Sequence, residues 1–495
     1  MRPLRFVWLY LFACALIGVA AGQTITANFG SRNLTARPIP AGMFGINLSD
    51  LQDPGTLSEL QQAGITWTRK MAKIPDVYAT KTPNWQPVDW YMRLVAQSGQ
   101  HPLIVLDATP PWLQPSSKPC GSGNPERAAP SDVNQWAQIA AAYVAHLDQN
   151  FPRAVKYYEI WNEPELDTSL CVSDGTDATR LKTYLALYSA AAKAMRAQAA
   201  KDGFTIKIGG PTISRFSLGP EWIGGLLSNS STAPYVDFVS YHAYITGPTQ
   251  ISNGMNWSSL YSITQSSNQG ELHYYQMMYN LVRAGKQPHA SSTPIFLTEY
   301  NDGWSFQQDC CRNSQAYGAL WNITALLDFM NSYYAGTNAA PARVFYYAGS
   351  APPYFCIAGT WNSSMNCDST SLHFYPQYYA FQLIASNSYL GLSGGGHLAS
   401  SVSSANTQSG LLATAFFTGA KDVVLIVNPT ATNYSSVNVV AQNAGFSSAT
   451  AKRYLINSAN YQIATNSVTL SKISGGYSVY VQVPAYSVVA VALAP

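Results

Sequence analysis

Two glutamates in similar settings could perform acid–base chemistry together. Glu163 follows an apolar run, Val155 to Trp161, that is typical of a buried strand, and Pro164 predicts the end of that strand. Glu299 closes a second short apolar run that starts at Ile295. Hydrolysis of a glycosidic bond requires two such carboxyls, one that donates a proton and one that acts as nucleophile or base. The pair therefore predicts a glycosidase, although either glutamate alone would also suit a solvated strand end.

The two carboxyls require different protonation states. Glu163 is predicted to be the general acid/base, so its pKa must be raised by poor solvation or by the other carboxylate. Glu299 is predicted to be the nucleophile, and Arg69 at the end of an earlier strand is placed to keep it ionised. Glu159 is interpreted as a deeper ion-pair residue, and Glu165 as a structural loop acid.

Further residues at strand ends are predicted to contact substrate. Asn162 could donate to a sugar hydroxyl, and Asp107 could bind a hydroxyl or cap its loop. His242 and Tyr244 end a strand, where His242 could also be a buried core histidine. Tryptophans that follow strands could stack on sugar rings or belong to the core: Trp112, Trp304 and Trp361. No CxxC motif or histidine pair is present, so no metal and no organic cofactor is predicted.

The elements that position these residues alternate between strand and helix. The expected strands are Met43–Asn47, Ile65–Arg69, Leu103–Asp107, Val155–Asn162, Thr205–Gly209, Val236–His242, Ile295–Glu299 and Arg343–Tyr347. Helical patterns follow each of them, with Asp132 and Asp177 at N-cap positions. Eight such repeats predict an α/β fold, a (β/α)8 TIM barrel over residues 41–386, with functional groups at the C-terminal ends of the strands.

The chain changes character after residue 386. Residues 387–495 are rich in Ser, Thr, Val, Ala and Gly and alternate in short apolar runs, which predicts an antiparallel β-sandwich. Residues 23–40 begin with an alternating segment that is predicted to be an N-terminal strand joining this sandwich.

Composition favours a protein that meets neutral polymers. Of 495 residues only 11% are charged, against about 25% in typical domains, while the chain has 32 tyrosines and 12 tryptophans. Nucleic-acid binding would require clustered Lys and Arg, so it is not expected.

The N-terminus is predicted to direct secretion. Residues 1–22 combine Arg2 and Arg5 with a short apolar run and small residues before a cleavage site, which is typical of a signal peptide. No other stretch is expected to span a membrane. Seven Asn-x-Ser/Thr acceptors would matter in a eukaryotic source: Asn33, Asn47, Asn229, Asn256, Asn322, Asn362 and Asn433.

Six cysteines remain after the predicted cleavage, and an even number in a secreted chain favours disulfides. Cys120 and Cys171 could meet above the barrel, and Cys356 could pair with Cys367. Cys310 and Cys311 could form a vicinal bridge or pair with other cysteines. Sequence alone does not choose among these pairings, nor does it give an oligomeric state.

The segment Ile160 to Pro164 resembles the Asn-Glu-Pro motif of the large clan of retaining TIM-barrel glycosidases. Four further segments are similar to family 39 of the glycoside hydrolases, the β-xylosidase and α-L-iduronidase family: Thr109–Leu113, Ile208–Pro211, Val239–Tyr244 and Leu297–Asn301. The resemblance implies that Asn162 holds the sugar 2-hydroxyl. It also implies that His242 and Tyr244 lie beside the nucleophile.

The expected activity is hydrolysis of a β-linked oligo- or polysaccharide, of the β-xylosidase kind or a related cell-wall or extracellular type. Two alternatives stay open. One is a β-glucuronidase resembling family 79, which the scarcity of Lys and Arg in the strand-end loops disfavours. The other is a non-catalytic carbohydrate-binding barrel, which the presence of both Glu163 and Glu299 disfavours.

Overall fold

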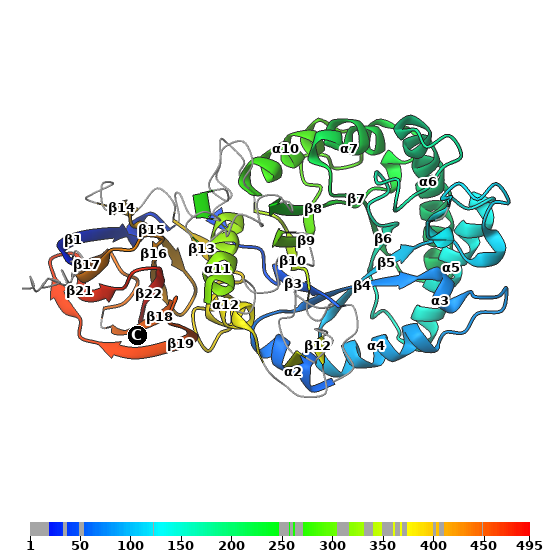
Figure 1. Ribbon diagram of the computed structural model, residues 1–495. Coiled ribbons are helices and arrows are strands. Elements are labelled where there is room, and N and C mark those ends of the chain that lie inside the picture. The colour runs from blue at the N-terminus through cyan, green and yellow to red at the C-terminus, as the bar shows by residue number, and fades with distance from the viewer. Residues whose placement is uncertain are drawn as a thin grey trace, which may run out of the picture.

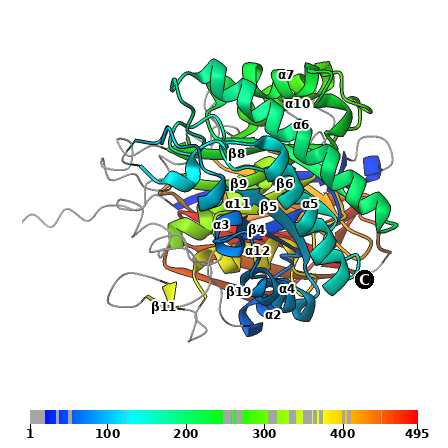
Figure 2. The same cartoon turned by 90° about the vertical axis from the view of Figure 1, so that its right-hand side faces the viewer.

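The computed structural model contains a closed ring of strands and helices beside a layered group of strands (Figures 1 and 2). The described residues are 19–32, 37–48, 54–121, 123–246, 257, 261–262, 271–303, 316–330, 340–348, 360–361, 367–368, 374–398, 402–404, 410–447 and 449–495. The predicted fold class, a TIM barrel with a β-sandwich, is confirmed.

Eight parallel strands close the barrel in the order β10-β3-β4-β5-β6-β7-β8-β9. Their bounds are β3 Phe44–Asn47, β4 Trp67–Lys73, β5 His101–Asp107, β6 Tyr157–Ile160, β7 Lys207–Ile213, β8 Phe238–Thr246, β9 Ile295–Gly303 and β10 Arg343–Tyr346. The helices of the barrel are α2 Pro54–Gln62, α3 Ile74–Val77, α4 Gln86–Ser98, α5 Val133–Asn150, α6 Asp177–Lys201, α7 Gly219–Ser228, α10 Glu271–Ala284, α11 Ala316–Met330 and α12 Pro376–Ala385. Parallel pairing brings all the strands' C-terminal ends to one rim.

Six of the eight strands end at positions other than those predicted, and the differences in β6 and β4 shape this rim. β6 stops at Ile160 rather than Asn162, because Trp161 adopts a φ of +68°, outside the range of strand residues. β4 continues four residues past Arg69 to Lys73, which pairs with Asp107 of β5. Among the caps, Asp132 accepts from two backbone N–H groups as predicted, whereas Thr176 rather than Asp177 caps α6.

Aromatic side chains fill the barrel near the N-terminal ends of its strands. Phe238 and Phe296 stack with their ring centroids 4.4 Å apart, and they form a buried cluster with Trp67 and Phe345. Gly209 leaves room for this layer, since a Cβ there would lie 2.2 Å from the Phe238 ring. The interior is therefore packed at this end, and polar groups occupy the other.

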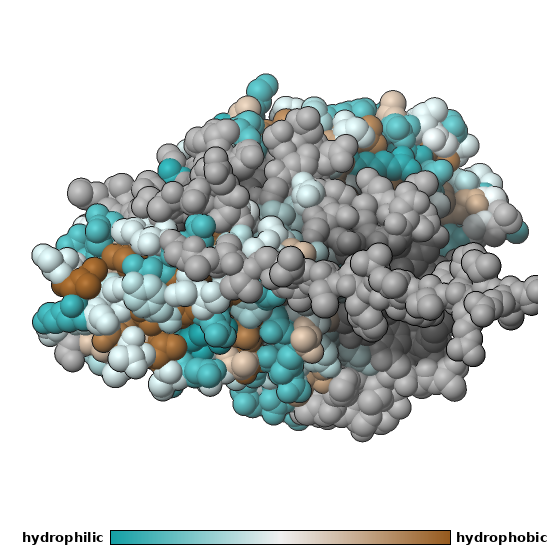
Figure 3. All heavy atoms as spheres, turned by 60° about the vertical axis from the view of Figure 1, so that its left-hand side comes forward, coloured by the Kyte–Doolittle hydropathy of each residue, from teal (hydrophilic) through white to brown (hydrophobic). Residues whose placement is uncertain are grey.

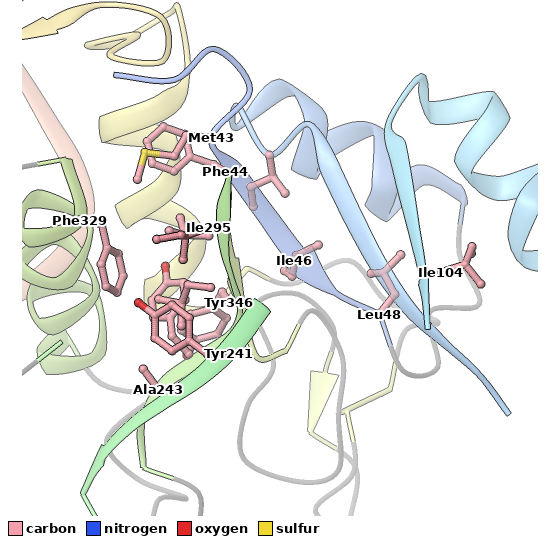
Figure 4. Close-up of a cluster of buried hydrophobic side chains, with 14 of the residues drawn as sticks. Met43, Phe44, Ile46, Leu48, Ile104, Tyr241, Ala243, Ile295, Phe329 and Tyr346 are labelled. Atoms are coloured by element: carbon pink, nitrogen blue, oxygen red, sulfur yellow. The ribbon is translucent and has the colours of Figure 1, made fainter. Parts of the chain in front are cut away.

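The main core lies between the strands and the surrounding helices. Figure 4 shows Phe329 of α11 beside Ile295 and Tyr346 of two barrel strands, with Met43 and Phe44 above them. All five side chains are at most 2% exposed. Close packing of these buried side chains holds the strands in fixed positions, and with them the residues at the strand ends.

The second domain takes strands from both ends of the chain. One sheet has the order β14-β1-β17-β21-β20, with bounds Val402–Ser404, Val19–Asn28, Asn433–Gln442, Gly476–Val483 and Ser471–Ile473. The other has the order β19-β18-β22-β16-β15-β13-β2, with bounds Asn460–Val468, Thr450–Asn457, Ser487–Ala494, Asp422–Asn428, Leu412–Phe417, Gly396–His397 and Arg37–Pro38. Pairing is antiparallel except between β1 and β17, where Ile25 lies opposite Val439.

The sandwich packs directly on the barrel. Helices α11 and α12 lie between the two bodies (Figure 1) and contact β18 and β19. Tyr454 and Ile456 of the sandwich belong to the same buried cluster as the barrel core.

The outer surface in Figure 3 carries separate apolar spots among hydrophilic residues. Within the described part of the chain, none of the helices has the length and apolarity that a membrane span requires.

A disulfide joins Cys120 and Cys171, the pair expected to meet above the barrel. It ties the loop after β5 to the loop after β6, where Ala128 and Cys171 also form a β-bridge. Cys310, Cys311 and Cys356 lie outside the described residues, as does the side chain of Cys367. The proposed pairings of those four cysteines therefore stay predictions.

Candidate active site

Glu163 and Glu299 meet at the C-terminal rim of the barrel. Glu163 lies in the segment that follows β6, and Glu299 lies within β9. One carboxylate oxygen of each, together with a ring nitrogen of His242, lies within 4.8 Å of the others. The side chain of Glu163 is 20% exposed and that of Glu299 is 7% exposed. Two distant parts of the chain thus present their carboxyls to one small space.

Arg69 donates hydrogen bonds to four side chains around this pair. Its Nη1 donates to Glu299 Oε1 at 2.7 Å, and its Nε donates to Glu159 Oε2 at 2.7 Å. The remaining donors reach Asn47 Oδ1 at 2.9 Å and Asn162 Oδ1 at 2.8 Å. Burial opposes the charge of Arg69, but the two carboxylates outweigh it and raise its pKa. The Arg69–Glu159 contact is an ion pair inside the barrel, and Arg69 faces Glu299.

Asn47 is a member of this network that sequence reasoning did not select. It ends β3, and its side-chain amide donates to the carbonyl of Thr298 at 2.8 Å while its Oδ1 accepts from Arg69. Its position as a polar residue at a strand end was the available signal. At 5% exposure it is a poor glycosylation acceptor despite its Asn-Leu-Ser sequence, and Asn322 is fully buried.

His242 and Tyr244 of β8 contact both carboxyls. His242 Nδ1 lies 2.9 Å from Glu163 Oε1 and 3.5 Å from Glu299 Oε2, while the Tyr244 hydroxyl donates to Glu299 Oε2 at 2.6 Å. Burial lowers the pKa of His242 to about 4, so the ring is neutral at ordinary pH. Nε2 has no hydrogen-bond partner among the described residues, so we assign the ring proton to Nδ1, between the carboxyls.

Glu163 is built to hold a proton. Burial raises its pKa to about 6, although the hydroxyl of Ser214 and the charges of Arg69 and Arg127 act in the opposite direction. Its backbone has a φ of +48°, and its N–H donates to Thr212 Oγ1 at 3.2 Å. A non-glycine residue in this conformation is held there by its surroundings. The carboxyl is therefore fixed in place and half-protonated near pH 6.

The pH profile should report this proton. We expect kcat/KM for a substrate whose leaving group requires a proton to fall as pH rises through about 6, because the acid form of Glu163 is lost there. Steady-state rates between pH 4 and 9 measure this limb. In Glu163→Gln the limb should disappear, and a limb that persists in that variant would assign the proton to another group.

Asp107 lies deeper than the sequence suggested. It is fully buried, and its Oδ2 accepts from Arg127 Nη1 at 2.5 Å. Burial raises its pKa, which the Arg127 contact counteracts. Arg127 comes from the disulfide-tied loop and acts electrostatically on Glu163. Asp107 therefore anchors a cation near the site rather than presenting a free carboxylate to solvent.

The structure describes, to different extents, the three tryptophans that were predicted to contact sugar. Trp112 is half-buried, its Nε1 donates to the carbonyl of Tyr78 at 3.1 Å, and the Lys81 ammonium lies 5.6 Å from the centre of its ring. Trp304 lies outside the described residues. The backbone of Trp361 pairs with Cys367 in the short hairpin β11 (Thr360–Trp361) and β12 (Cys367–Asp368), and its side chain is outside the description. Sugar stacking by these residues stays a prediction.

Two cavities are lined by residues of this network. A cavity of about 870 Å³ is lined by Arg69, Lys70 and Lys73 of β4. A second of about 790 Å³ is lined by Glu163, Tyr244 and other residues that follow β6 and β7. Each volume falls in the range of about 300–1,000 Å³ typical of small-molecule sites. Residues of the network around Arg69 and Glu163 thus border two spaces that are each large enough for a small substrate.

The cluster of Glu163, His242 and Glu299 is also close enough to hold a metal ion. Its hydrogen bonds argue for acid–base work, since Arg69 and Tyr244 already occupy both oxygens of Glu299. A cation bound there would face the fully buried Arg69 guanidinium at the same carboxylate. The donor set therefore fits a proton-transfer pair better than a metal site.

A TIM barrel with two facing glutamates at its C-terminal rim defines the class of barrel glycoside hydrolases. The family model "Glycosyl hydrolases family 39" matches residues 70–471, and the chain belongs to this family. A search of curated proteins gives no match. The resemblance to family 39 is confirmed, and the protein is an enzyme of the glycoside hydrolase class, which sets aside the non-catalytic alternative.

Solved structures show the same fold over nearly the whole chain. The family 39 enzyme from Xanthomonas axonopodis pv. citri aligns with a TM-score of 0.66 at 15% identity, over 98% of this chain and 100% of that one. A monomeric β-xylosidase from Caulobacter crescentus CB15 gives 0.65 at 15% identity, over 96% and 100%. A family 30 endoxylanase from Clostridium papyrosolvens C71 gives 0.60 at 14% identity, over 95% and 100%. At these identities the likeness concerns the fold.

Proposed function

We propose that this protein is a secreted retaining glycosidase that cleaves β-linked glycans by double displacement. The observation that carries the proposal is the distance between the carboxyls, with oxygens of Glu163 and Glu299 within 4.8 Å. Retaining enzymes hold their carboxyls about 5–5.5 Å apart, whereas inverting enzymes leave about 6.5–9.5 Å for a water molecule. The short separation favours a covalent intermediate.

In the first step Glu299 is the nucleophile. Its carboxylate forms a bond to the anomeric carbon while the bond from that carbon to the leaving oxygen breaks, and Glu163 gives its proton to that oxygen. Arg69 and Tyr244 hold Glu299 in one orientation, because each donates to one of its two oxygens. His242 donates to Glu163 without competing as an acid, because its ring is already neutral.

In the second step the roles reverse. Water attacks the anomeric carbon, its proton passes to Glu163, and the bond to Glu299 breaks, which regenerates both side chains. The Oδ1 of Asn162 accepts from Arg69, which leaves its Nδ2 as the group expected to donate to the sugar 2-hydroxyl. Such a contact strengthens as positive charge develops on the sugar.

A β-xyloside is the first substrate to test, because two of the similar solved structures are described as β-xylosidases. A β-glucuronide is the second candidate. The extension of β4 brings Lys70 and Lys73 to the cavity beside Arg69, where the sequence suggested few cations. An ammonium group there could bind the carboxylate of a uronic acid.

Replacement of Glu163 by alanine should separate its two roles. We expect kcat/KM for a phenyl β-glycoside to fall about 10²–10⁴-fold, because the leaving oxygen loses its proton donor. A 2,4-dinitrophenyl glycoside, whose leaving group requires no proton, should keep a fast first step. Azide should then restore turnover and give a β-glycosyl azide, detected by mass spectrometry and NMR. Unchanged activity of Glu163→Ala on the phenyl glycoside would exclude the acid/base role.

The function itself is tested with aryl β-xylosides, β-glucosides and β-glucuronides, followed by ¹H NMR of the first product. We expect cleavage with release of the β-anomer. Release of the α-anomer would contradict double displacement, and cleavage of the glucuronide alone would favour the second substrate. Secretion is tested by expression of the full chain, since N-terminal sequencing of exported protein should begin near residue 23.

A further inference from the structure

Glu165 links the loop that carries Glu163 to the loop after the neighbouring strand. Its Oε1 accepts from the Ser214 N–H at 2.6 Å, from the Ser214 hydroxyl at 2.9 Å and from the Arg215 N–H at 3.0 Å. The side chain is fully buried, and Arg180 donates to its backbone carbonyl at 3.2 Å. Three donors on one buried oxygen fix the start of the segment that follows β7.

Ser214 faces the reacting space from that segment. Ser214, Arg215 and Glu163 line the same cavity of about 790 Å³. The Ser214 hydroxyl donates to Glu165, and its electrostatic effect lowers the pKa of Glu163. Thr212, near the end of β7, accepts from the Glu163 N–H through its Oγ1 at 3.2 Å. The end of β7 and the segment after it are therefore held to the Glu163 loop at two points, the Glu165 contacts and the Thr212 contact.

We propose that Glu165 is a positioning residue for the acid/base: it holds the segment after β7 against the loop that carries Glu163 and so keeps the Glu163 carboxyl aimed at the leaving oxygen. This inference rests on the proposed function of Glu163. It goes beyond the interpretation of Glu165 as a structural loop acid, because it assigns Glu165 an effect on one step, the transfer of a proton to the leaving group. Glu165 itself does not reach the substrate in this scheme.

The proposal predicts a leaving-group dependence. Glu165→Ala should lower kcat/KM for phenyl β-xyloside about 10- to 100-fold, because a displaced acid transfers its proton poorly. The same variant should lose about threefold or less on 2,4-dinitrophenyl β-xyloside, whose departure does not require the proton. The ratio of the two kcat/KM values is independent of the fraction of folded enzyme, so it separates positioning from a general loss of stability.

Three companion variants sharpen the test. Glu165→Gln keeps an acceptor oxygen of the same reach and should preserve the wild-type ratio within about threefold. Ser214→Ala removes the hydroxyl but keeps both backbone donors to Glu165, so it should show a smaller loss than Glu165→Ala, again selective for the phenyl substrate. Glu221→Gln, on the exposed first turn of α7, is the matched control and should leave both rates unchanged.

The outcomes distinguish the two levels of inference. If Glu163→Ala shows the leaving-group dependence and Glu165→Ala loses activity equally on both substrates, the positioning role is wrong while the proposed function stands. If Glu163→Ala itself shows no dependence, the acid/base assignment fails first. A selective loss in Glu165→Ala and Ser214→Ala, with recovery in Glu165→Gln, supports the proposal.

Discussion

Replacement of Glu299 by glutamine should reduce turnover by about 10⁴-fold or more, the largest effect expected from any single change in this enzyme. The amide is a far weaker nucleophile than a carboxylate, so the proposed covalent glycosyl-enzyme could not form. Glutamine has the same size, and its oxygen can still accept from Arg69, which donates to the wild-type carboxylate at 2.7 Å. The fold should therefore persist, and kcat on an activated aryl glycoside is the measurement.

A covalent label provides the control for this variant. A 2-fluoro glycosyl fluoride of the cleaved sugar should add one glycosyl mass to the wild-type peptide that contains Glu299, and it should leave Glu299→Gln unlabelled. Tyr244→Phe removes only the 2.6 Å hydrogen bond to Glu299 and should retain far more activity than Glu299→Gln. Labelling of another residue, or near-normal turnover by Glu299→Gln, would overturn the assignment of the nucleophile.

Replacement of Arg69 by methionine should have the largest effect on stability. The guanidinium is fully buried between Glu159 and Glu299, and its loss leaves two carboxyls without their counter-charge. Breaking a buried pair in this way costs about 3–5 kcal/mol. We also expect kcat to fall sharply, because Glu299 would lose the donor that orients its carboxylate. Denaturant unfolding monitored by tryptophan fluorescence, together with kcat, measures both effects.

Two comparisons test the reason for that loss. Arg69→Met combined with Glu159→Gln removes one stranded charge, so it should regain part of the unfolding free energy without regaining activity. Lys207→Met breaks an ion pair with Asp237 at 3.2 Å in which Lys207 is 55% exposed, and it should change stability by about 0.5 kcal/mol or less. Equal losses in Arg69→Met and Lys207→Met would contradict the view that burial makes Arg69 important.

The sequence was informative where local pattern and chemistry coincide. Short apolar runs that end in carboxyls predicted that Glu163 and Glu299 would lie toward the C-terminal ends of barrel strands, although β9 continues past Glu299 to Gly303, and alternation of strand with helix predicted the barrel. The ends of the strands were harder to predict from the sequence. The stop of β6 depends on the conformation of Trp161, whose indole donates to the carbonyl of Ser169, and a local pattern does not contain that contact.

By itself the sequence determined the fold class and the pair of acids, because strand periodicity and the position of a carboxyl after an apolar run are properties of neighbouring residues. Only the tertiary structure decided which of these side chains form ion pairs and hydrogen bonds with one another. Arg69 contacts Glu159 and Glu299, which lie 90 and 230 positions away along the chain. Glu165 accepts from Ser214, which lies 49 positions away. Such contacts exist only after the barrel closes, since closure brings distant strand ends within hydrogen-bonding distance of one another.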